Sequence, residues 1–391
     1  MSSPNPTIFL SCAEASGDLH AGNLIEASRE ILPSARWLGC GGDRCKAAGM
    51  EAAHHVSELS VMGATDVIRA LPRIRRIFND LVELARRERP AVAVLVDSPD
   101  LHLRLAKPLR RLGIPVIQYV SPQLWAWRPG RIWTVARRVD RLLCILPFEP
   151  PLYAGTGLRA DYIGHPLADE VRVERDRAAT LSAHGLDPGR PTVALLPGSR
   201  AGEVAHLLPV YVEAARRLGE QVEGLQVLLS RAPTIDETAV AEALALPRCA
   251  PITGRLHDAI AAADLVWVAS GTASVEVALL RRPMVILYRA GALTAFIAKR
   301  VVRIPHLGLV NILAGEGVVP ELLQEQATPE RLVAESLPLL TDPSAAAAQV
   351  AAIDRAIEPL DRPGASARAA EIVAEVVGLG VGGKTTKSTK G

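Results

Sequence analysis

One loop of this chain carries residue types that bind phosphate. Gly198, Ser199 and Arg200 follow a strand-like apolar run, Thr192–Leu196, and precede a stretch with helical periodicity. A glycine lets the backbone approach a ligand, and the following helix offers unpaired N–H groups and the positive end of its dipole. Ser199 adds a hydroxyl, and the Arg200 guanidinium can fork onto phosphate oxygens. The pattern fits a phosphate cradle and equally an ordinary turn capped by Ser199.

A second loop further along the chain has a similar pattern. Ser270, Gly271 and Thr272 follow the strand-like run Leu265–Ala269 and open a helix, so their backbone and hydroxyl donors can also hold phosphate. Glu276 lies one helical turn further on, where its carboxylate can accept from two ribose hydroxyls. Helix capping by Ser270 or Thr272 explains this loop alone, but it does not explain two such loops together. The pair predicts a nucleotide diphosphate site.

Two acidic residues follow a strand in the first half of the chain. Asp97 and Asp100 come after the run Ala91–Val96, which is typical of a parallel strand covered on both faces. Ligands of open α/β sheets bind beyond the carboxyl ends of the strands, so Asp97 is a candidate general base facing a cleft between domains. The alternative, given equal weight, is that its carboxylate bonds its own backbone in the Ser-Pro turn. That alternative is favoured for Asp100.

A fourth candidate loop lies near the N-terminus. Glu14, Ser16, Gly17 and Asp18 form a small polar turn after the strand-like run Ile8–Cys12. The turn has neither the G-x-G-x-x-G spacing nor that of a Walker loop. Its polar groups can contact a sugar or a phosphate, whereas helix capping by Ser16 or Asp18 is the simpler and slightly favoured explanation.

Several kinds of site have no pattern in this sequence. No Asp-x-Asp pair occurs that would hold Mg²⁺ or Mn²⁺ against a diphosphate, and neither H-E-x-x-H nor a Cys/His cluster suggests zinc. The absence of G-x-S-x-G argues against an α/β-hydrolase. The histidines are scattered, and each alone is expected to be structural. We expect no metal and no cofactor.

Composition favours two aliphatic α/β domains. The chain has 391 residues, 49% of them apolar but only 4% aromatic. At roughly 100–200 residues per domain, this length suggests two domains. The net charge of +2 argues against nucleic acid as the main partner. Five cysteines without a C-x-x-C motif are expected to be buried thiols in a reducing compartment.

Strand-like and helical patterns alternate twice along the chain, which predicts right-handed βαβ units and open parallel sheets. The predicted domains are residues 1–185 and 186–345, with a charged linker region at 168–190. A helical segment is expected at 346–377 and a disordered lysine-rich tail at 378–391. The expected strands are 8–12, 36–40, 91–96, 116–120, 142–145, 192–196, 226–229, 265–269 and 284–287, and the principal expected helices are 19–30, 65–89 and 203–218.

The sequence predicts a cytoplasmic protein without a membrane-spanning helix, because it shows no signal peptide and its longest apolar runs have strand length. A basic, partly apolar stretch at 67–78 nevertheless places Arg69, Arg73 and Arg76 at helical spacing, although Pro72 is expected to disturb its first turn. Such a segment can lie on an anionic membrane, and a solvated helix face is the commoner outcome. Residues that could extend this surface are Trp125–Arg128, Lys299, Arg300 and Arg303.

In combination and in order, these and other segments resemble the lipid-A-disaccharide synthase family from about Ile8 to Leu340. The Trp-Ala-Trp-Arg and Asn-Ile-Leu-Ala-Gly segments are the most specific. The matching segments are Glu14–Asp18, Val61–Gly63, Asp97–Asp100, Tyr119–Pro122, Trp125–Arg128, Leu146–Glu149, Ile163–His165, Leu195–Arg200, Ala269–Thr272 with Glu276, and Asn311–Gly315.

The resemblance implies a GT-B fold, in which two Rossmann-like domains have parallel sheets facing an interdomain cleft. It implies transfer of 2,3-diacylglucosamine from UDP-2,3-diacylglucosamine to 2,3-diacylglucosamine 1-phosphate. The new bond is a β-1,6 linkage, the anomeric centre is inverted, and UDP is released. Members of the family work without a metal. They are cytoplasmic, attach peripherally to the inner membrane, and include homodimers.

The resemblance also implies roles for individual residues. Asp97 is the expected general base that takes the proton of the acceptor 6-hydroxyl. Gly198, Ser199 and Arg200 are expected to hold the donor diphosphate, and Glu276 the ribose. The other residues carried over are Ser270, Gly271 and Thr272 in the diphosphate cradle, Asn311 in the active site without an assigned role, and Glu14, Ser16, Gly17 and Asp18 on the acceptor side.

The chain departs from the family in two places without losing a proposed catalytic group. Cys12–Ala13 replaces the usual Ala-Gly pair, and Leu307–Val310 lacks the proline that often adjoins Asn311. Two rivals share the fold, namely a muropeptide N-acetylglucosaminyltransferase and a UDP-sugar 2-epimerase. An epimerase should place several acids and a histidine around the sugar, and no such set aligns here. A non-catalytic nucleotide-binding protein is a further alternative, and it would not need Asp97.

Overall fold

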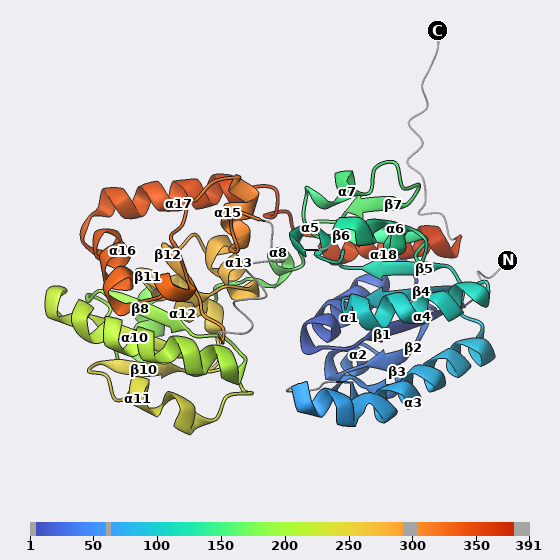
Figure 1. The fold of residues 1–391 in the computed structure, drawn as a ribbon, viewed down its shortest axis with the longest axis horizontal. Coiled ribbons are helices and arrows are strands. Elements are labelled where there is room, and N and C mark those ends of the chain that lie inside the picture. Colours follow the sequence, from blue (N-terminus) through green and yellow to red (C-terminus); the bar gives the residue numbers. More distant parts are fainter. Residues whose placement is uncertain (1–4, 60–63, 128, 292–303, 379–391) are drawn as a thin grey trace, which may run out of the picture. The chain divides into compact units, whose positions relative to one another are not determined.

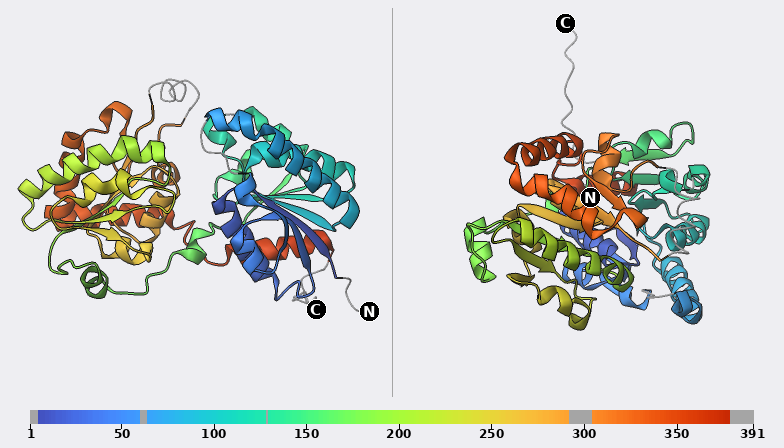
Figure 2. Two further views of the ribbon diagram at one scale, coloured as in Figure 1. Left: turned by 90° about the horizontal axis from the view of Figure 1, so that it is seen from below. Right: turned by 60° about the vertical axis from the view of Figure 1, so that its left-hand side comes forward.

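The computed structural model describes residues 5–59, 64–127, 129–291 and 304–378. The chain divides into two compact units. Unit 1 comprises Met1–Asp169 and Arg362–Gly391, and unit 2 comprises Glu170–Asp361. Each unit has one parallel sheet with helices on both faces (Figure 1; Figure 2). The predicted α/β class with two parallel sheets is therefore confirmed.

The sheet of unit 1 has the strand order β3-β2-β1-β4-β5-β6-β7, and every neighbouring pair is parallel. The strands β2 and β3 that follow β1 are added on one side of it, whereas β4 and the later strands are added on its other side. The position between β1 and β4 is therefore the switch point, where ligands of such sheets bind. The strands are β1 Thr7–Cys12, β2 Arg36–Gly41, β3 Glu51–His55, β4 Val92–Val96, β5 Val116–Tyr119, β6 Arg141–Cys144 and β7 Arg159–Tyr162.

Alternation of apolar side chains explains why this sheet is covered on both faces. Ile8 and Leu10 of β1 lie in one buried cluster, and Phe9 lies in the cluster on the opposite face. In β4, Val94 lies in the first of these clusters and Leu95 lies in the second. Because successive side chains of a strand point to opposite faces, an unbroken apolar run requires two covering layers.

Helices supply those layers in unit 1. α18 comes from the far C-terminal part of the chain and packs beside α1, where Ala370 and Val373 join the cluster of β1 (Figure 1). α3 continues through Pro72. The helices are α1 Ala15–Ser28, α2 Asp43–Ala47, α3 Ala64–Glu88, α4 Pro99–Arg111, α5 Leu124–Trp127, α6 Ile132–Ala136, α7 Glu149–Leu152, α8 Leu167–Glu170 and α18 Ala365–Val377, with 3₁₀ turns η1 Val56–Glu58 and η2 Pro129–Arg131.

The sheet of unit 2 repeats this topology in the order β10-β9-β8-β11-β12-β13, again parallel throughout. Its switch point lies between β8 and β11. The fully buried Trp267 of β11 anchors the core, and its Nε1 donates to Ser336 Oγ at 2.8 Å. The strands are β8 Thr192–Leu196, β9 Gln226–Ser230, β10 Cys249–Ile252, β11 Leu265–Ala269, β12 Met284–Tyr288 and β13 Glu321–Leu323.

The helices of unit 2 flank its sheet in the same manner (Figure 2). They are α9 Arg177–Ala183, α10 Ala201–Gln221, α11 Ala241–Leu244, α12 Leu256–Ala262, α13 Thr272–Leu279, α15 Leu309–Ala314, α16 Pro329–Thr341 and α17 Pro343–Ile357, with 3₁₀ turns η3 Glu237–Val240 and η4 Gln324–Gln326. No helix in the described part of the chain is both long and apolar enough to span a membrane.

The unit boundaries differ from the predicted domains. The division falls between Asp169 and Glu170 instead of at residue 185, because the expected linker packs on unit 2. Arg177 of α9 pairs with Asp264 at 2.9 Å, and the Glu174 N–H donates to Asp258 at 2.7 Å. The segment 346–377 is not one piece, since α17 belongs to unit 2 and α18 to unit 1.

Four predictions fall wholly or partly outside the described residues. These are the tail beyond Gly378, the Val61–Gly63 segment, Arg128, and the basic residues Lys299, Arg300 and Arg303.

Candidate active site

A cavity of about 610 Å³ opens in unit 2 at the carboxyl ends of β8, β9, β10 and β11. It therefore lies at the switch point of this sheet. Its volume falls within the range of about 300–1,000 Å³ that is typical of small-molecule sites. The cavity brings together all the residues predicted for the donor, namely Gly198, Ser199, Arg200, Ser270, Gly271, Thr272 and Glu276.

Gly198 shapes the loop between β8 and α10. Its φ is +105°, a backbone conformation that residues with a side chain rarely adopt, so any other residue would be strained there. Arg200 precedes the first turn of α10, and its side chain is 79% exposed. Glu203 lies 3.2 Å from one guanidinium nitrogen and orients the group. The remaining donors of Arg200 can reach a ligand beside the helix N-terminus.

The loop between β11 and α13 is open toward the cavity. The Ser270 N–H donates to Leu287 O at 2.9 Å, which fixes the loop to the end of β12. Gly271 precedes the helix, and no atom lies within 4 Å of the position a Cβ would take. Ser274 Oγ donates to Gly271 O at 2.7 Å and closes the first turn. The N-terminus of α13 is thus preformed and accessible to an anion.

Glu276 lies on the half-buried side of α13. Its Oε2 is 3.7 Å from Nε2 of His257, so the pair joins α13 to α12. The carboxylate remains part of the cavity lining. A carboxylate only accepts hydrogen bonds, so it suits the hydroxyls of a sugar ring better than a phosphate.

Sequence reasoning missed the part of the cavity that follows β9 and β10. Arg231 donates to Ile235 O at 2.8 Å, and Arg255 pairs with Glu174 and lies 3.6 Å from Asp258. The rule that ligands gather beyond strand ends would have reached the segment after β9, whereas β10 itself was not expected. The missed lining residues include Ser230, Arg231, Ala232, Pro233, Ile252, Gly254, Arg255 and Leu256.

Two helix N-termini and three arginines give this cavity the means to hold a polyanion. The two loops follow β8 and β11, which are neighbouring strands of the sheet, so both helix N-termini open on one cavity. Glu276 adds an acceptor for hydroxyl groups. The arrangement suits a nucleoside diphosphate.

Asp97 occupies the corresponding edge of the sheet in unit 1. It follows β4, and both Asp97 and Ser98 have left-handed backbones, with φ of +57° and +42°. Such conformations cost about 1–3 kcal/mol each and cluster at functional sites. Three hydrogen bonds hold the turn. The Asp97 N–H donates to Tyr119 O at 2.8 Å, and its carbonyl accepts from His102 Nδ1 at 2.7 Å and Gln118 Nε2 at 3.0 Å.

His102 is the neutral side chain that positions the backbone of Asp97. It is completely buried, and burial lowers its pKa to about 4. Because the Asp97 carbonyl can only accept, Nδ1 of His102 carries the proton. Nε2 then accepts from the Ser11 hydroxyl at 3.1 Å. The histidine expected to be structural therefore fixes the backbone of the proposed base.

Gly17 brings the first turn of α1 against the end of β4. A Cβ there would lie 3.5 Å from Val96 O and 3.9 Å from Asp97 Cβ. Glu14 and Ser16 are exposed in the same turn. Three of the four residues predicted on the acceptor side therefore belong to the turn that adjoins Asp97.

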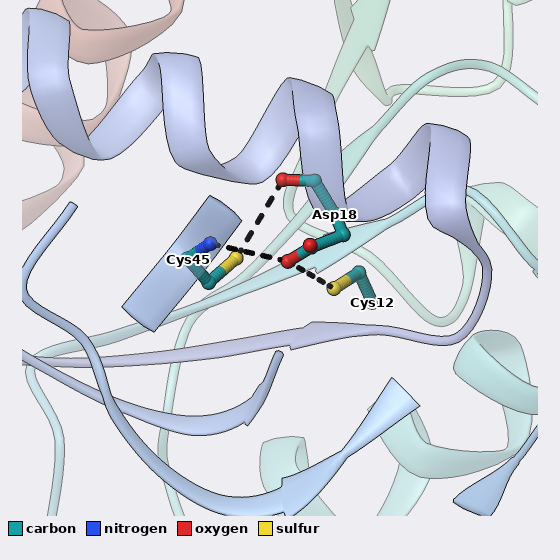
Figure 3. Close-up of side chains that lie close together, drawn as sticks. All are labelled: Cys12, Asp18 and Cys45. Carbon is teal, nitrogen blue, oxygen red and sulfur yellow. Dashed lines mark hydrogen bonds between the residues drawn. The ribbon is translucent and has the colours of Figure 1, made fainter. Parts of the chain in front are cut away.

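Asp18, the fourth of them, is engaged elsewhere (Figure 3). Its carboxylate accepts from the N–H groups of Gly42, Arg44 and Cys45 at 2.6, 3.0 and 3.2 Å, at the N-terminus of α2. Burial alone would raise the pKa of Asp18, but the hydrogen bonds outweigh it and lower that pKa. Only 6% of the residue is exposed. We assign Asp18 the capping of α2 in place of the predicted contact with the acceptor.

Cys12 and Cys45 flank Asp18 closely enough to raise the question of a metal site (Figure 3). Their ligand atoms lie within 4.8 Å of one another. The hydrogen bond with Cys12 and burial raise the pKa of the Cys45 thiol far above its usual range, which keeps it protonated. A metal binds the thiolate, and the Asp18 carboxylate is already occupied, so the group fits packing better than ligation.

Asn311 has a clear structural role, which the sequence did not reveal. It is buried, and its Oδ1 accepts from the N–H groups of Val318 and Val319, both at 2.9 Å. Its Nδ2 donates to Val319 O at 2.9 Å and to Glu321 Oε1 at 2.7 Å. The amide therefore fastens the turn between α15 and β13, and its bonding capacity is used within that turn.

The parallel sheets of the two units define the class of protein, the GT-B fold, and the cavity of unit 2 suits an anionic ligand such as a nucleoside diphosphate. The UDP-GlcNAc 2-epimerase of Neisseria meningitidis bound to UDP-GlcNAc matches with a TM-score of 0.62 at 10% identity, covering 94% of this chain and 99% of that one. MurG of Acinetobacter baumannii matches with a TM-score of 0.57 at 13% identity, covering 95% and 99%. At such identities the likeness shows the fold alone.

The family is shown by closer matches. The sequence model described as "Lipid-A-disaccharide synthetase" matches residues 8–376. The lipid-A-disaccharide synthase of Myxococcus xanthus (strain DK1622) is 42% identical over 374 residues, which is 95% of this chain and 98% of that protein. That of Anaeromyxobacter dehalogenans (strain 2CP-C) is 44% identical over 375 residues, or 95% and 97%. The chain belongs to the lipid-A-disaccharide synthase family, which separates it from the rivals of the same fold.

Proposed function

We propose that this protein transfers 2,3-diacylglucosamine from UDP-2,3-diacylglucosamine to 2,3-diacylglucosamine 1-phosphate. The product is a β-1,6-linked disaccharide 1-phosphate, and UDP leaves. The observation that carries the proposal is the cavity of unit 2, which gathers both predicted phosphate loops and Glu276 in a chain of this family.

The cavity of unit 2 binds the UDP portion of the donor. The N-termini of α10 and α13 and the exposed Arg200 hold the diphosphate, and Glu276 accepts from the ribose hydroxyls. As the bond from the anomeric carbon to the phosphate oxygen breaks, negative charge grows on UDP. Fixed N–H groups and a guanidinium stabilise that charge without reorganisation. They supply the positive charge that a divalent metal would otherwise supply.

Asp97 acts as the general base. Its carboxylate takes the proton of the acceptor 6-hydroxyl while that oxygen attacks the anomeric carbon from the face opposite UDP. A positioned base contributes about 10²–10⁴ to the rate. The left-handed turn and the hydrogen bonds from His102 and Gln118 fix the backbone from which this carboxylate extends. Glu14 and Ser16, exposed in the adjoining turn, contact the acceptor sugar.

We also propose that α3 attaches the protein to the surface of the inner membrane from the cytoplasmic side. The exposed side chains of Leu71, Arg73, Arg75 and Arg76 combine an apolar residue with positive charge, which suits an anionic lipid surface. Reversing the charge of the three arginines should reduce binding to anionic liposomes. Unchanged binding would remove α3 from the proposal.

The function is tested by incubating the protein with both acylated substrates and measuring disaccharide and UDP. Formation of both products in equal amounts is the expected result. UDP release without disaccharide would indicate hydrolysis, and UDP binding without turnover would indicate a nucleotide-binding protein. Activity should persist in EDTA, and its loss would contradict a mechanism in which arginines and helix ends carry the positive charge.

A further inference from the structure

A small apolar cavity in unit 1 has no part in the chemistry described so far. Its volume is about 70 Å³, and almost all of its lining is carbon. Leu124 and Tyr153 are buried at its base, and Trp125 is held edge-on against Phe148 with ring centroids 5.1 Å apart. The Tyr153 hydroxyl is bonded to Ser121 at 3.4 Å. The lining residues are Pro122, Leu124, Trp125, Pro129, Ile132, Leu152 and Tyr153.

The cavity lies on the same edge of the sheet as Asp97. Its residues follow β5 and β6, and β5 is paired with β4 so that Tyr119 lies opposite Val96. The guanidinium of Arg131, between the lining residues Pro129 and Ile132, contacts Asp100 at 3.1 Å. Asp100 is in the first turn of α4, three residues after Asp97. The walls of the cavity are thereby tied to the turn that carries the proposed base.

One exposed apolar side chain lines this cavity. Leu152 is 38% exposed. Only four large hydrophobic residues of the described chain are exposed to this degree, and Leu152 is the one of them that lines the cavity. A concave site lined by apolar and aromatic side chains suits an apolar ligand.

We propose that this cavity binds the terminal carbons of an acyl chain of the acceptor. The inference rests on the proposed function, in which the acceptor carries two such chains and gives its hydroxyl proton to Asp97. An engineered cavity of ~150 Å³ takes benzene, with six carbons, so about 70 Å³ accommodates roughly three carbons of a chain. The residues that line the cavity therefore bind the end of the acyl chain and also select acceptors by the length of that chain.

The donor carries acyl chains as well, and the two sources are distinguished by varying one substrate at a time. Burying one methylene contributes about 0.8 kcal/mol, which is about fourfold in kcat/KM. Shortening the acceptor chains by three carbons, with the donor unchanged, should lower kcat/KM by about 50-fold, mostly through KM. Shortening the donor chains should leave this dependence unchanged. A dependence that follows the donor alone would overturn the assignment.

Leu152→Trp tests the cavity directly, because the larger ring fills its mouth. The variant should lose most of the dependence on the last three carbons of the acceptor, to less than about fourfold, while its rate with the shortened acceptor stays near that of the wild type. Val173→Trp is the matched control, since Val173 is an exposed apolar residue of unit 2 outside both cavities. It should retain the full dependence.

Other results have definite meanings. A Leu152→Trp variant with the wild-type dependence, or one whose kcat falls equally for all chain lengths, would overturn the inference. If that variant fails to fold, as judged by thermal unfolding and UDP binding, Leu152→Ala removes the same wall and should reduce the dependence to about tenfold. Failure of the wild-type protein to form any disaccharide would instead remove the proposed function, and the inference with it.

Discussion

The two units use one topology for the two sites proposed above. In each sheet the functional loops follow the first and fourth strands, on either side of the switch point. In unit 2 these loops are open, since Gly271 adjoins empty space and Arg200 extends into solvent. In unit 1 they are closed, because Gly17 packs against β4 and the backbone of Asp97 is fixed on three sides.

The difference agrees with the role proposed for each loop. A diphosphate brings its own charge and is satisfied by several N–H groups and a guanidinium, so an open loop at a helix end suffices. A general base must be within hydrogen-bonding distance of one particular proton, so its backbone is worth fixing even in a left-handed conformation. Topology therefore decides where the sites are, and residue type and packing decide what they do.

Asp97→Asn should have the largest effect. The amide keeps the size of the side chain and tolerates the left-handed backbone, but it cannot take a proton, so kcat should fall by about 10²–10⁴. UDP binding in unit 2, measured by calorimetry, should not change. Asp100→Asn, three residues away, is the control and should keep most of the activity. A largely active Asp97→Asn enzyme would show that unit 1 supplies no base.

His102→Gln tests the support beneath that base through the dependence of stability on pH. Burial lowers the pKa of His102 from its ordinary value of 6.5 to about 4, so between these values the unfolded chain binds a proton that the folded protein does not. The contribution of His102 to stability is therefore present above about pH 6.5 and is lost as the pH falls to about 4, by about 3 kcal/mol.

Glutamine keeps an N–H donor for the Asp97 carbonyl but does not titrate. Chemical denaturation at about pH 8 and about pH 4.5 should show that His102→Gln loses less unfolding free energy on acidification than the wild type. Equal losses in wild type and His102→Gln would mean that His102 is not held neutral.

Arg200→Ala tests whether the open loop of unit 2 binds the diphosphate. Charge-assisted hydrogen bonds contribute about 1.5–3 kcal/mol, so UDP binding and donor KM should weaken by about 10- to 100-fold. Arg216→Ala removes an exposed arginine from the same helix and should leave both unchanged. If Arg200→Ala binds UDP as tightly as wild type, the exposed guanidinium is not part of the cradle.

Asp18→Asn should have the smallest effect, and on stability only. The amide NH₂ would face a backbone N–H of α2, so the unfolding free energy should fall by about 1–3 kcal/mol, with the acceptor KM unchanged. Glu14→Gln, in the exposed part of the same turn, should raise the acceptor KM and leave the unfolding free energy unchanged. A raised acceptor KM in Asp18→Asn at normal stability would restore the original interpretation of Asp18 as an acceptor contact.

The sequence predicted the interior of both sheets and missed their margins. Within the described residues, each interior strand was expected, and the edge strands β3, β7, β10 and β13 were not. Interior strands are covered on both faces and give unbroken apolar runs, whereas an edge strand is short and partly exposed, as Glu51–His55 and Glu321–Leu323 are. The residues after β10 were missed for the same reason.

By itself the sequence determined the α/β class, the family, and the loops that carry Asp97, Arg200 and Glu276, because these depend on residue type and on local periodicity. Only the tertiary structure decided that Asp18 caps α2, that Asn311 fastens a turn, and that α18 returns to unit 1. Asp18 and α18 depend on partners distant in the chain, such as the N–H of Gly42 for Asp18, and Asn311 depends on a turn that begins seven residues after it. The spacing of residues along the sequence does not identify such partners, because a carboxylate or an amide stands in the same local sequence whether it contacts a substrate or a neighbouring helix.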